Sequence, residues 1–221
     1  MRFQDAAKDA RTVVYAGIQA DPVVARTAEL LAGATHGQRV MARAVMNGQT
    51  LDPAGWREMF PTVFAADAPG RAEAEALLES ALSVADRGND VRNQLRGAIV
   101  EALTERLLAE RVGSSVVRRE RRILFDGVRA EIHPYDVTVE RDGAAEAYDC
   151  KWGARGINAD VLHQLDDART HAADEDETLV CVLVVFDARV SCDVRLGRQT
   201  APVEGIDLVS LESLDRLAGR G

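Results

Sequence analysis

The pattern of hydrophobic and polar positions separates a helical N-terminal region from a C-terminal region of alternating strands and helices. Up to about residue 88, Ala, Leu, Glu and Arg dominate and runs of β-branched residues are few, which predicts helices. Asp21-Pro22 and Asp52-Pro53 each place an N-capping acid before a proline suited to the first helical position. We therefore expect helices beginning at these two pairs, and further helices over residues 37–46 and 71–85.

From about residue 112 the chain changes to segments rich in Val, Ile, Tyr and Thr that are separated by glycine. These segments predict three strands, over residues 115–125, 128–140 and 144–152. Asp126-Gly127 and Asp142-Gly143 are typical of tight hairpin turns between antiparallel strands. The second and third strands are therefore expected to be antiparallel neighbours.

The remaining residues complete an α/β pattern. Helical spacing returns over residues 158–172. A buried strand, a last strand and a short helix capped by Ser210 follow, over residues 179–186, 206–209 and 211–217. We expect two regions: an all-helical accessory region over residues 1–88, for dimerisation or sensing, and an α/β domain with a mixed central sheet over residues 89–221.

Composition and charge narrow the classes of function. Hydrophobic residues make up 47% of the chain, enough for a globular core. The formal net charge of −9 argues against a simple polybasic nucleic-acid binder, but not against an enzyme whose carboxylates hold a metal ion. The three cysteines give no disulfide framework, and the longest strongly apolar run, over residues 179–186, is too short to cross a bilayer. Since the first residues also lack a signal-peptide pattern, we expect a soluble, cytoplasmic protein without a membrane segment.

The candidate chemistry lies in the second and third expected strands. Asp149 and Lys151 are two positions apart and share one face of a strand, whereas Cys150 points to the other face. A hairpin would bring the strand that carries Asp136 alongside them. Two carboxylates beside one buried lysine leave an excess negative charge, and burying it is costly unless another positive group compensates it. A divalent metal ion would do so.

An acid, a short hairpin and then acid-x-Lys in the next strand resemble the PD-(D/E)XK, or restriction-endonuclease-like, nuclease superfamily. The resemblance covers about residues 91–217 and implies a core of helix, three strands, helix and strand. It implies that Asp136 and Asp149 bind the metal ion, with the carbonyl of Cys150 as a further ligand, and that Lys151 orients or activates the attacking water. The chain departs from the pattern in having Asp149 in place of the commoner glutamate, and in separating Pro134 from Asp136.

The same family often has a glutamate on the helix before the sheet and a glutamine on the helix after the lysine strand. Glu101 matches the first as a catalytic and metal-binding candidate, with Glu105 one turn further on. Gly97 shares a helical face with Glu101, and its small size would let that face approach the sheet. Gln164 matches the second position as a catalytic candidate.

Other interpretations of these residues remain open. Asp136, Asp149 and Lys151 are also compatible with an ion-pair ladder on an antiparallel sheet. Trp152 and Arg155 are candidates for contacts with a base and a phosphate, although Trp152 equally suits a hydrophobic core. The basic cluster Arg118–Arg122 fits phosphate contacts or the protective charges of an exposed strand edge.

The resemblance implies a metal-dependent nuclease that hydrolyses phosphodiester bonds, with DNA favoured over RNA and restriction or antiphage defence as the context. Magnesium is the expected ion, with manganese as a substitute, because every proposed ligand atom is an oxygen. We expect a homodimer or a complex with a partner protein. The alternative is an inactive nuclease-fold module that binds nucleic acid or a partner protein within a larger complex.

Overall fold

A computed structural model describes residues 1–6, 10–48, 52–126, 128–129, 133–141, 144–201 and 203–220. The chain forms two compact units. The helical unit comprises Asp9–Leu103, and the sheet unit comprises Met1–Lys8 together with Thr104–Gly221. The division falls within helix α6 (Asn89–Val112), 15 residues after the boundary expected at residue 88. Of the two expected hairpin turns, residue 127 and residues 142–143 lie outside the described residues.

The helical unit consists of helices α1 to α5 and the first part of α6. The first five helices are α1 (Ala10–Gln19), α2 (Pro22–Gly33), α3 (His36–Met46), α4 (Pro53–Met59) and α5 (Arg71–Ala85). Asp21 caps α2 by accepting a hydrogen bond from the backbone N–H of Val23 at 3.0 Å. Asp52 caps α4 in the same way, from the N–H of Gly55 at 2.7 Å. Both helix starts predicted at Asp-Pro pairs are therefore confirmed.

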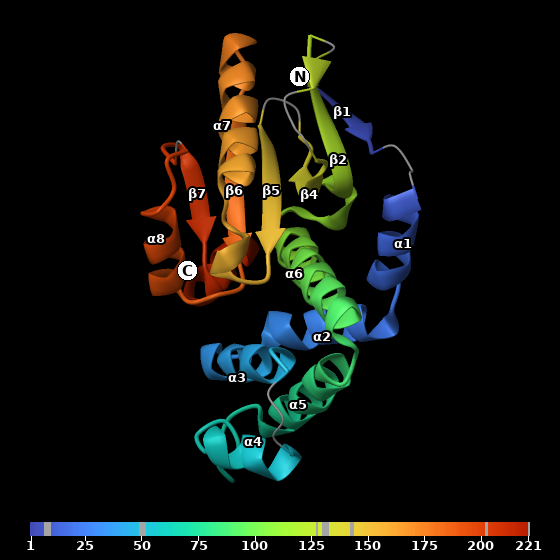
Figure 1. Cartoon of the computed structure of the whole chain (residues 1–221), viewed down its shortest axis with the longest axis vertical. Helices are drawn as coiled ribbons and strands as arrows, with labels where there is room; N and C mark the ends of the chain where they lie inside the picture. Colours follow the sequence, from blue (N-terminus) through green and yellow to red (C-terminus); the bar gives the residue numbers. More distant parts are fainter. Residues whose placement is uncertain are drawn as a thin grey trace. The chain divides into compact units, whose positions relative to one another are not determined.

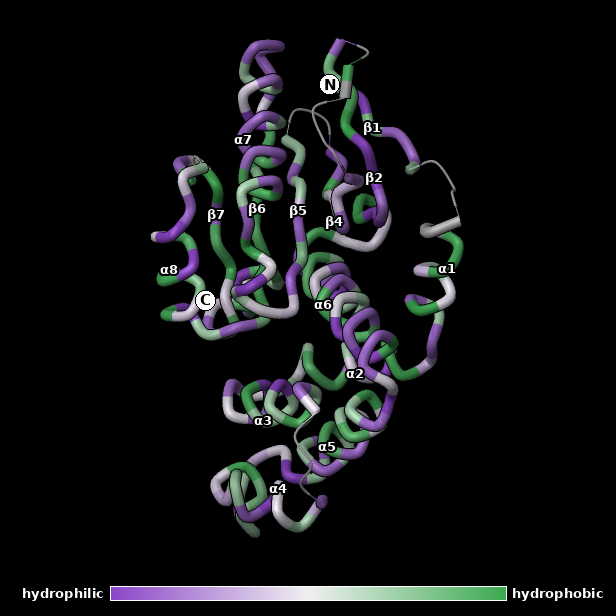
Figure 2. Tube along the Cα trace, in the orientation of Figure 1, coloured by the Kyte–Doolittle hydropathy of each residue, from purple (hydrophilic) through white to green (hydrophobic). Residues whose placement is uncertain are grey.

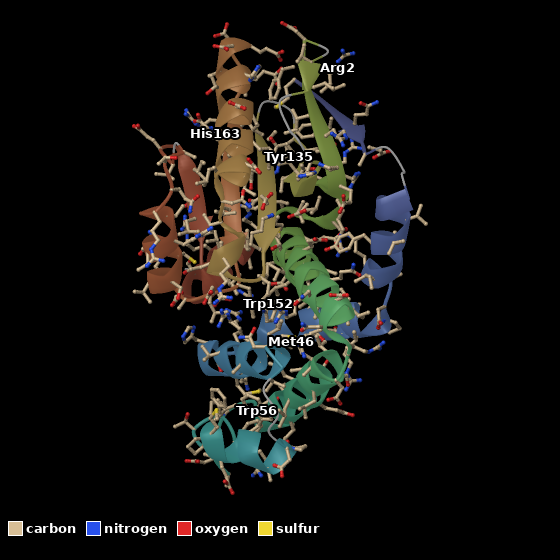
Figure 3. All side chains as sticks on the ribbon, in the orientation of Figure 1. Arg2, Met46, Trp56, Tyr135, Trp152 and His163 are labelled. Atoms are coloured by element: carbon tan, nitrogen blue, oxygen red, sulfur yellow. The ribbon has the colours of Figure 1, made fainter. Side chains whose placement is uncertain are left out.

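The core of the helical unit lies where α5 packs against α2 and α3. Leu31, Met41 and Leu77 are completely or almost completely buried. Thr27 and Ser80 satisfy each other's hydroxyl groups in this interior, at 2.7 Å. Trp56 of α4, labelled in Figure 3, is also fully buried.

The sheet unit is built on one mixed sheet, as expected for the α/β class. Its strands are β1 (Arg2–Asp5), β2 (Val117–Phe125), β3 (Val128–Arg129), β4 (Tyr135–Val139), β5 (Ala145–Lys151), β6 (Leu179–Val185) and β7 (Ile206–Val209). Their order is β1-β2-β4-β5-β6-β7, with β3 paired to β2. Pairing is antiparallel from β1 to β5 and parallel from β5 to β7 (Figure 1).

Helices and short 3-10 turns complete the sheet unit. They are the end of α6, η1 (Ser114–Val116), η2 (Ala154–Gly156), α7 (Ala159–Asp174), α8 (Arg189–Leu196) and η3 (Leu211–Ala218). Helix α7 runs along β6 (Figure 1), and Leu162 and Leu165 of the helix share one buried apolar cluster with Leu183 and Val185 of the strand. Figure 2 shows the apolar character of β6 that this packing requires. Among the described residues, no helix combines the length and the apolar character needed to cross a membrane.

The expectation of an all-helical N-terminal region is corrected by β1. Phe3 lies opposite Ile123 of β2, so β1 forms the edge of the sheet. Four residues are too few to show a periodicity of their own. Their partner lies about 120 residues away in the chain, and this non-local pairing stabilises the strand.

Two further differences concern the second half of the chain. The strand expected over residues 128–140 is divided into β3 and β4, with Pro134, which has no N–H to donate to a ladder, directly before β4. The helix α8, between β6 and β7, was not predicted from the sequence. Its two valines lower the helix propensity of this segment. Its buried Cys192 packs into the core of the sheet unit, and this tertiary packing favours the helix.

Candidate active site

The pairing of β4 with β5 brings Asp136 and Asp149 to neighbouring positions. Val137 lies opposite Tyr148 and Thr138 opposite Ala147, so the same register places Asp136 opposite Asp149. Residues directly opposite in an antiparallel pair lie on one face, with Cβ atoms about 4.5–5.5 Å apart. Asp149 is buried and Asp136 is half-buried. The two acids therefore meet on one patch of the sheet, as the hairpin argument predicted.

The carboxylate of Asp136 is oriented by the main chain of β5. Its Oδ2 atom accepts a hydrogen bond from the backbone N–H of Cys150 at 2.6 Å. The Cys150 side chain points to the other face of the sheet, where its Sγ contacts the Thr104 hydroxyl at 3.5 Å. This alternation confirms that Cys150 can offer only main-chain atoms to the patch that carries Asp149 and Lys151.

Lys151 completes the patch through an ion pair between its Nζ atom and Oδ1 of Asp149. Only 24% of the Lys151 side chain and 9% of the Asp149 side chain are exposed. Burial by itself lowers the pKa of Lys151, but the charges of Asp149 and Asp136 and the hydrogen bond that Lys151 donates to Asp149 outweigh it and raise this pKa above its usual value. Lys151 is therefore positively charged at neutral pH.

The segment after Lys151 is held by Asp187, a residue that the sequence interpretation missed. One carboxylate oxygen of Asp187 accepts the N–H of Ala154 at 3.0 Å, and the other accepts the N–H of Ala188 at 2.8 Å. Asp187 follows β6 almost directly, and the N–H of Phe186 binds the carbonyl of Lys151 at 2.9 Å. The sequence did contain a signal for Asp187, since it is an acid directly after a buried strand. The carboxyl ends of parallel strands meet at one edge of a sheet, so an acid after β6 is expected near Lys151 at the end of β5.

Trp152 and Arg155 lie in this segment. The Trp152 ring packs against Phe186, with ring centroids 5.2 Å apart and planes inclined at 31°. Trp152 remains partly exposed at the end of β5 (Figure 3). Part of its ring therefore packs against Phe186, and part is accessible from solvent. Arg155, in η2, is exposed.

Gln164 binds the main chain just before β4. Its amide oxygen accepts the N–H of His133 at 3.1 Å, and its amide nitrogen donates to the carbonyl of His133 at 3.0 Å. The Tyr135 hydroxyl donates to the main-chain carbonyl of Gln164. Gln164 therefore fixes the segment that leads into β4 and Asp136, which is a positioning role, and its catalytic role stays a prediction.

Glu101 belongs to the helical unit. Its carboxylate accepts hydrogen bonds from the Tyr15 hydroxyl and from Nε2 of Gln19, the latter at 2.8 Å. Gly97 leaves room for Tyr15, whose hydroxyl would lie 3.3 Å from a Cβ atom added at Gly97. Glu101 is thus engaged by α1, and its role as a metal ligand stays a prediction.

The basic cluster in β2 is engaged by nearby acids. Arg119 pairs with Glu105, and Arg121 pairs with Glu140 and Asp5. Since β2 has β1 on one side and β4 on the other, it is not the exposed edge strand that was one explanation for these charges. Glu120, in the middle of β2, has a φ of 52°, a left-handed conformation that costs about 1 kcal/mol or more for a residue with a side chain.

Within the described part of the chain, no group of three or more His, Cys, Asp or Glu side chains is placed to hold a metal ion. The patch offers two carboxylates, Asp136 and Asp149, and Lys151 lies close enough to both for its pKa to respond to their charges. Magnesium is commonly held by one or two protein carboxylates together with water and substrate phosphates. The oxygen donors of the patch therefore fit this ion.

No known relative emerges. Neither a protein-family model, nor a curated protein, nor a solved structure matches the chain. The function must therefore be argued from the patch itself.

One compositional signal at the patch was overlooked. Of the 27 lysine and arginine residues in the chain, only Lys8 and Lys151 are lysines. Arginine and lysine differ in that the ammonium is a compact point charge, whereas the guanidinium is a broad, planar fork. In a chain that uses arginine almost throughout, the compact charge of a lysine therefore stands beside Asp149.

Proposed function

We propose that this protein is a metal-dependent phosphodiesterase of the PD-(D/E)XK type that cleaves DNA. The observation that carries the proposal is the meeting of Asp136, Asp149 and Lys151 on one patch of the sheet. The support is the arrangement of charged groups expected for such an enzyme, on the strands where the resemblance places them.

The charges of the patch favour a divalent cation. Two carboxylates and one ammonium leave a formal charge of −1, largely shielded from solvent because Asp149 is buried. An uncompensated charge in such a place is costly, and a cation relieves the cost. Asp136, Asp149 and the carbonyl of Cys150 would hold the ion, and Mg²⁺ suits a set made only of oxygen atoms. When bound, the ion supplies positive charge against the scissile phosphate and acidifies water.

The protein's own residues divide the remaining work. Lys151 is protonated at neutral pH, so it donates hydrogen bonds to the attacking water or to a phosphate oxygen and does not act as the base. It offsets the negative charge that develops on the phosphate in the transition state. Asp136 is held in position by the N–H of Cys150, and the segment before it is held by Gln164. Trp152 and Arg155 are proposed to contact a base and a phosphate of the substrate.

DNA as the substrate, a role in restriction or antiphage defence, and a homodimer or partner complex complete the proposal. A dimer is expected because one active site cuts one strand at a time. The second candidate is a module that retains the strands of a nuclease but binds nucleic acid or protein without cleaving it. The ion pair between Lys151 and Asp149, which already offsets the charge of one carboxylate without a metal ion, favours this candidate.

A cleavage assay tests the proposal. Purified protein is incubated with plasmid, linear DNA, single-stranded DNA and RNA, each with Mg²⁺, Mn²⁺ or EDTA. We expect cleavage of DNA with either ion and none with EDTA. Asp136→Ala and Lys151→Ala should each reduce turnover by about a hundredfold or more, as loss of one electrostatic stabiliser does.

Asp207→Asn is the matched control, because it removes an acid of β7 that pairs with Arg216 on the surface of the same sheet. This variant should cleave like the wild type. Full activity of Lys151→Ala would reduce Lys151 to a structural ion-pair partner and would refute the assignment of the site.

A further inference from the structure

We infer that Gly156 is a positioning residue, whose missing side chain provides the space for the Lys151 stem and thereby holds the ammonium against Asp149. The inference deepens the proposed function, since it concerns how the charged group of that site is placed. It does not depend on a bound metal ion or substrate.

The contact is direct. A Cβ atom added at Gly156 would lie 2.9 Å from Cδ of Lys151, and 3.1 Å from both its Cβ and Cγ atoms. The optimal separation of two carbon atoms is about 3.5–4.0 Å, and the 2.9 Å contact is far enough below it that a methyl group at this position overlaps the stem. Because one of the three atoms is the Lys151 Cβ, rotation of the distal side chain cannot remove the whole overlap.

Space, rather than backbone conformation, requires the glycine. The left-handed conformations recorded for several glycines of the chain do not include Gly156. Its N–H closes a 3-10 turn on the carbonyl of Gly153 at 2.9 Å, a geometry open to other residues. An alanine is therefore excluded at Gly156 only by what lies beside it.

The segment that carries Gly156 is anchored on both sides and cannot retreat easily. Before it, the N–H of Ala154 is bound by Asp187. After it, the carbonyl of Ile157 accepts a hydrogen bond from Nε of Arg195 at 2.8 Å, and Ile157 is fully buried. The overlap is therefore relieved mainly by moving the Lys151 side chain, which takes the ammonium away from Asp149.

The two lysines of the chain make this movement measurable. A Lys8→Arg background leaves Lys151 as the only lysine, so ¹³C-labelled lysine gives a single side-chain signal in NMR spectra of the full chain. When Gly156→Ala is added to this background, we expect the Lys151 Cε signal to shift, because the ammonium moves away from Asp149. DNA turnover should fall about tenfold or more with little change in KM.

A thermal-unfolding cycle separates this contact from general damage. Gly156→Ala should lower the Tm by about 4–8 °C, typical of overpacking, in the wild type. It should lower the Tm less in the Lys151→Ala background, where the contacts with Cγ and Cδ are absent and only the contact with the Cβ atom of residue 151 remains. Gly197→Ala is the matched control: a Cβ atom there lies 3.4 Å from its nearest neighbour, and every readout should stay unchanged.

Each outcome decides the inference. An equal loss of Tm in both backgrounds, or an unchanged Lys151 signal in Gly156→Ala, would overturn it. If Gly156→Ala alone does not fold, folding of the double variant supports the inference, and failure of the double variant refutes it. Absence of nuclease activity in the wild type counts against the proposed function only, because the NMR signal and the Tm do not depend on cleavage.

Discussion

Asp149→Asn is the substitution that most directly tests the charge balance of the patch. Asparagine keeps the size of the side chain but removes the charge that pairs with Lys151. Breaking a buried ion pair by removing one partner costs about 3–5 kcal/mol. Because 24% of the Lys151 side chain reaches solvent and the charge of Asp136 remains nearby, we expect the lower part of that range or slightly less, about 2–3 kcal/mol.

Urea unfolding of the full chain, followed by circular dichroism, measures this loss. With a slope of about 2–3 kcal/mol per molar urea, the unfolding midpoint of the sheet unit should fall by about 1 M. Asp207→Asn breaks an ion pair in which both side chains are about half exposed, and it should cost less than about 1 kcal/mol. The two substitutions are chemically identical, so the difference between them reports burial.

The pH dependence of stability independently tests whether the charge of Lys151 stabilises the folded protein. The pKa of Lys151 is raised in the folded protein, so its contribution to stability is fully present below about pH 10.4, the unfolded value, and is lost as the pH rises through the folded value. The stability difference between wild type and Asp149→Asn should therefore be constant from pH 7 to 9 and shrink above pH 10.5. Equal midpoints for wild type and Asp149→Asn at pH 7 would show that the pair is not a buried one, and would refute this reasoning.

Three further predictions concern neighbouring residues. Asp136→Ala should sharply weaken Mn²⁺ binding in titration calorimetry, whereas Lys151→Ala should maintain or strengthen it, because the first removes a proposed ligand and the second removes a repelling charge; equal affinities in both variants would favour an ion-pair ladder. Gln164→Ala should lower stability by about 1–3 kcal/mol, since the main-chain groups of His133 lose two hydrogen bonds, and should slow cleavage while Mn²⁺ affinity changes little; chemical denaturation and cleavage rates check this. Asp52→Ala should lower the free energy of unfolding by about 1 kcal/mol through loss of the α4 cap and should leave cleavage unchanged. A slower cleavage rate in this variant would contradict the assignment of catalysis to the sheet unit alone.

The patch could be predicted from sequence because its geometry is local. Asp149 and Lys151 share a face through the two-residue period of a strand, and Asp136 joins them through the strand immediately before. Lengths and turn signals were sufficient to place these strands as neighbours, although the turn residues themselves lie outside the described part of the chain.

The contacts that hold the patch could not be predicted, because they join residues distant in sequence. Nothing near Asp187 indicates that its carboxylate binds the N–H of Ala154, 33 residues earlier. In the same way, Gln164 was correctly placed on a helix, but its partner His133 depends on how α7 packs over the sheet. Glu101 was interpreted by its position on the helix alone, and its engagement by Tyr15 requires the fold of α1.

The pairing of β1 with β2 determines the order in which the molecule can be completed. The chain passes through β1, builds the whole helical unit, and returns to the sheet only at Thr104. In topological terms, the helical unit is an insertion between two pieces of the other unit. At ribosomal rates of about 5–20 residues per second, β1 emerges roughly 6–24 s before its partner strand. The helical unit has time to fold first, so we expect β1 to join the sheet late during synthesis, after the helical unit has formed.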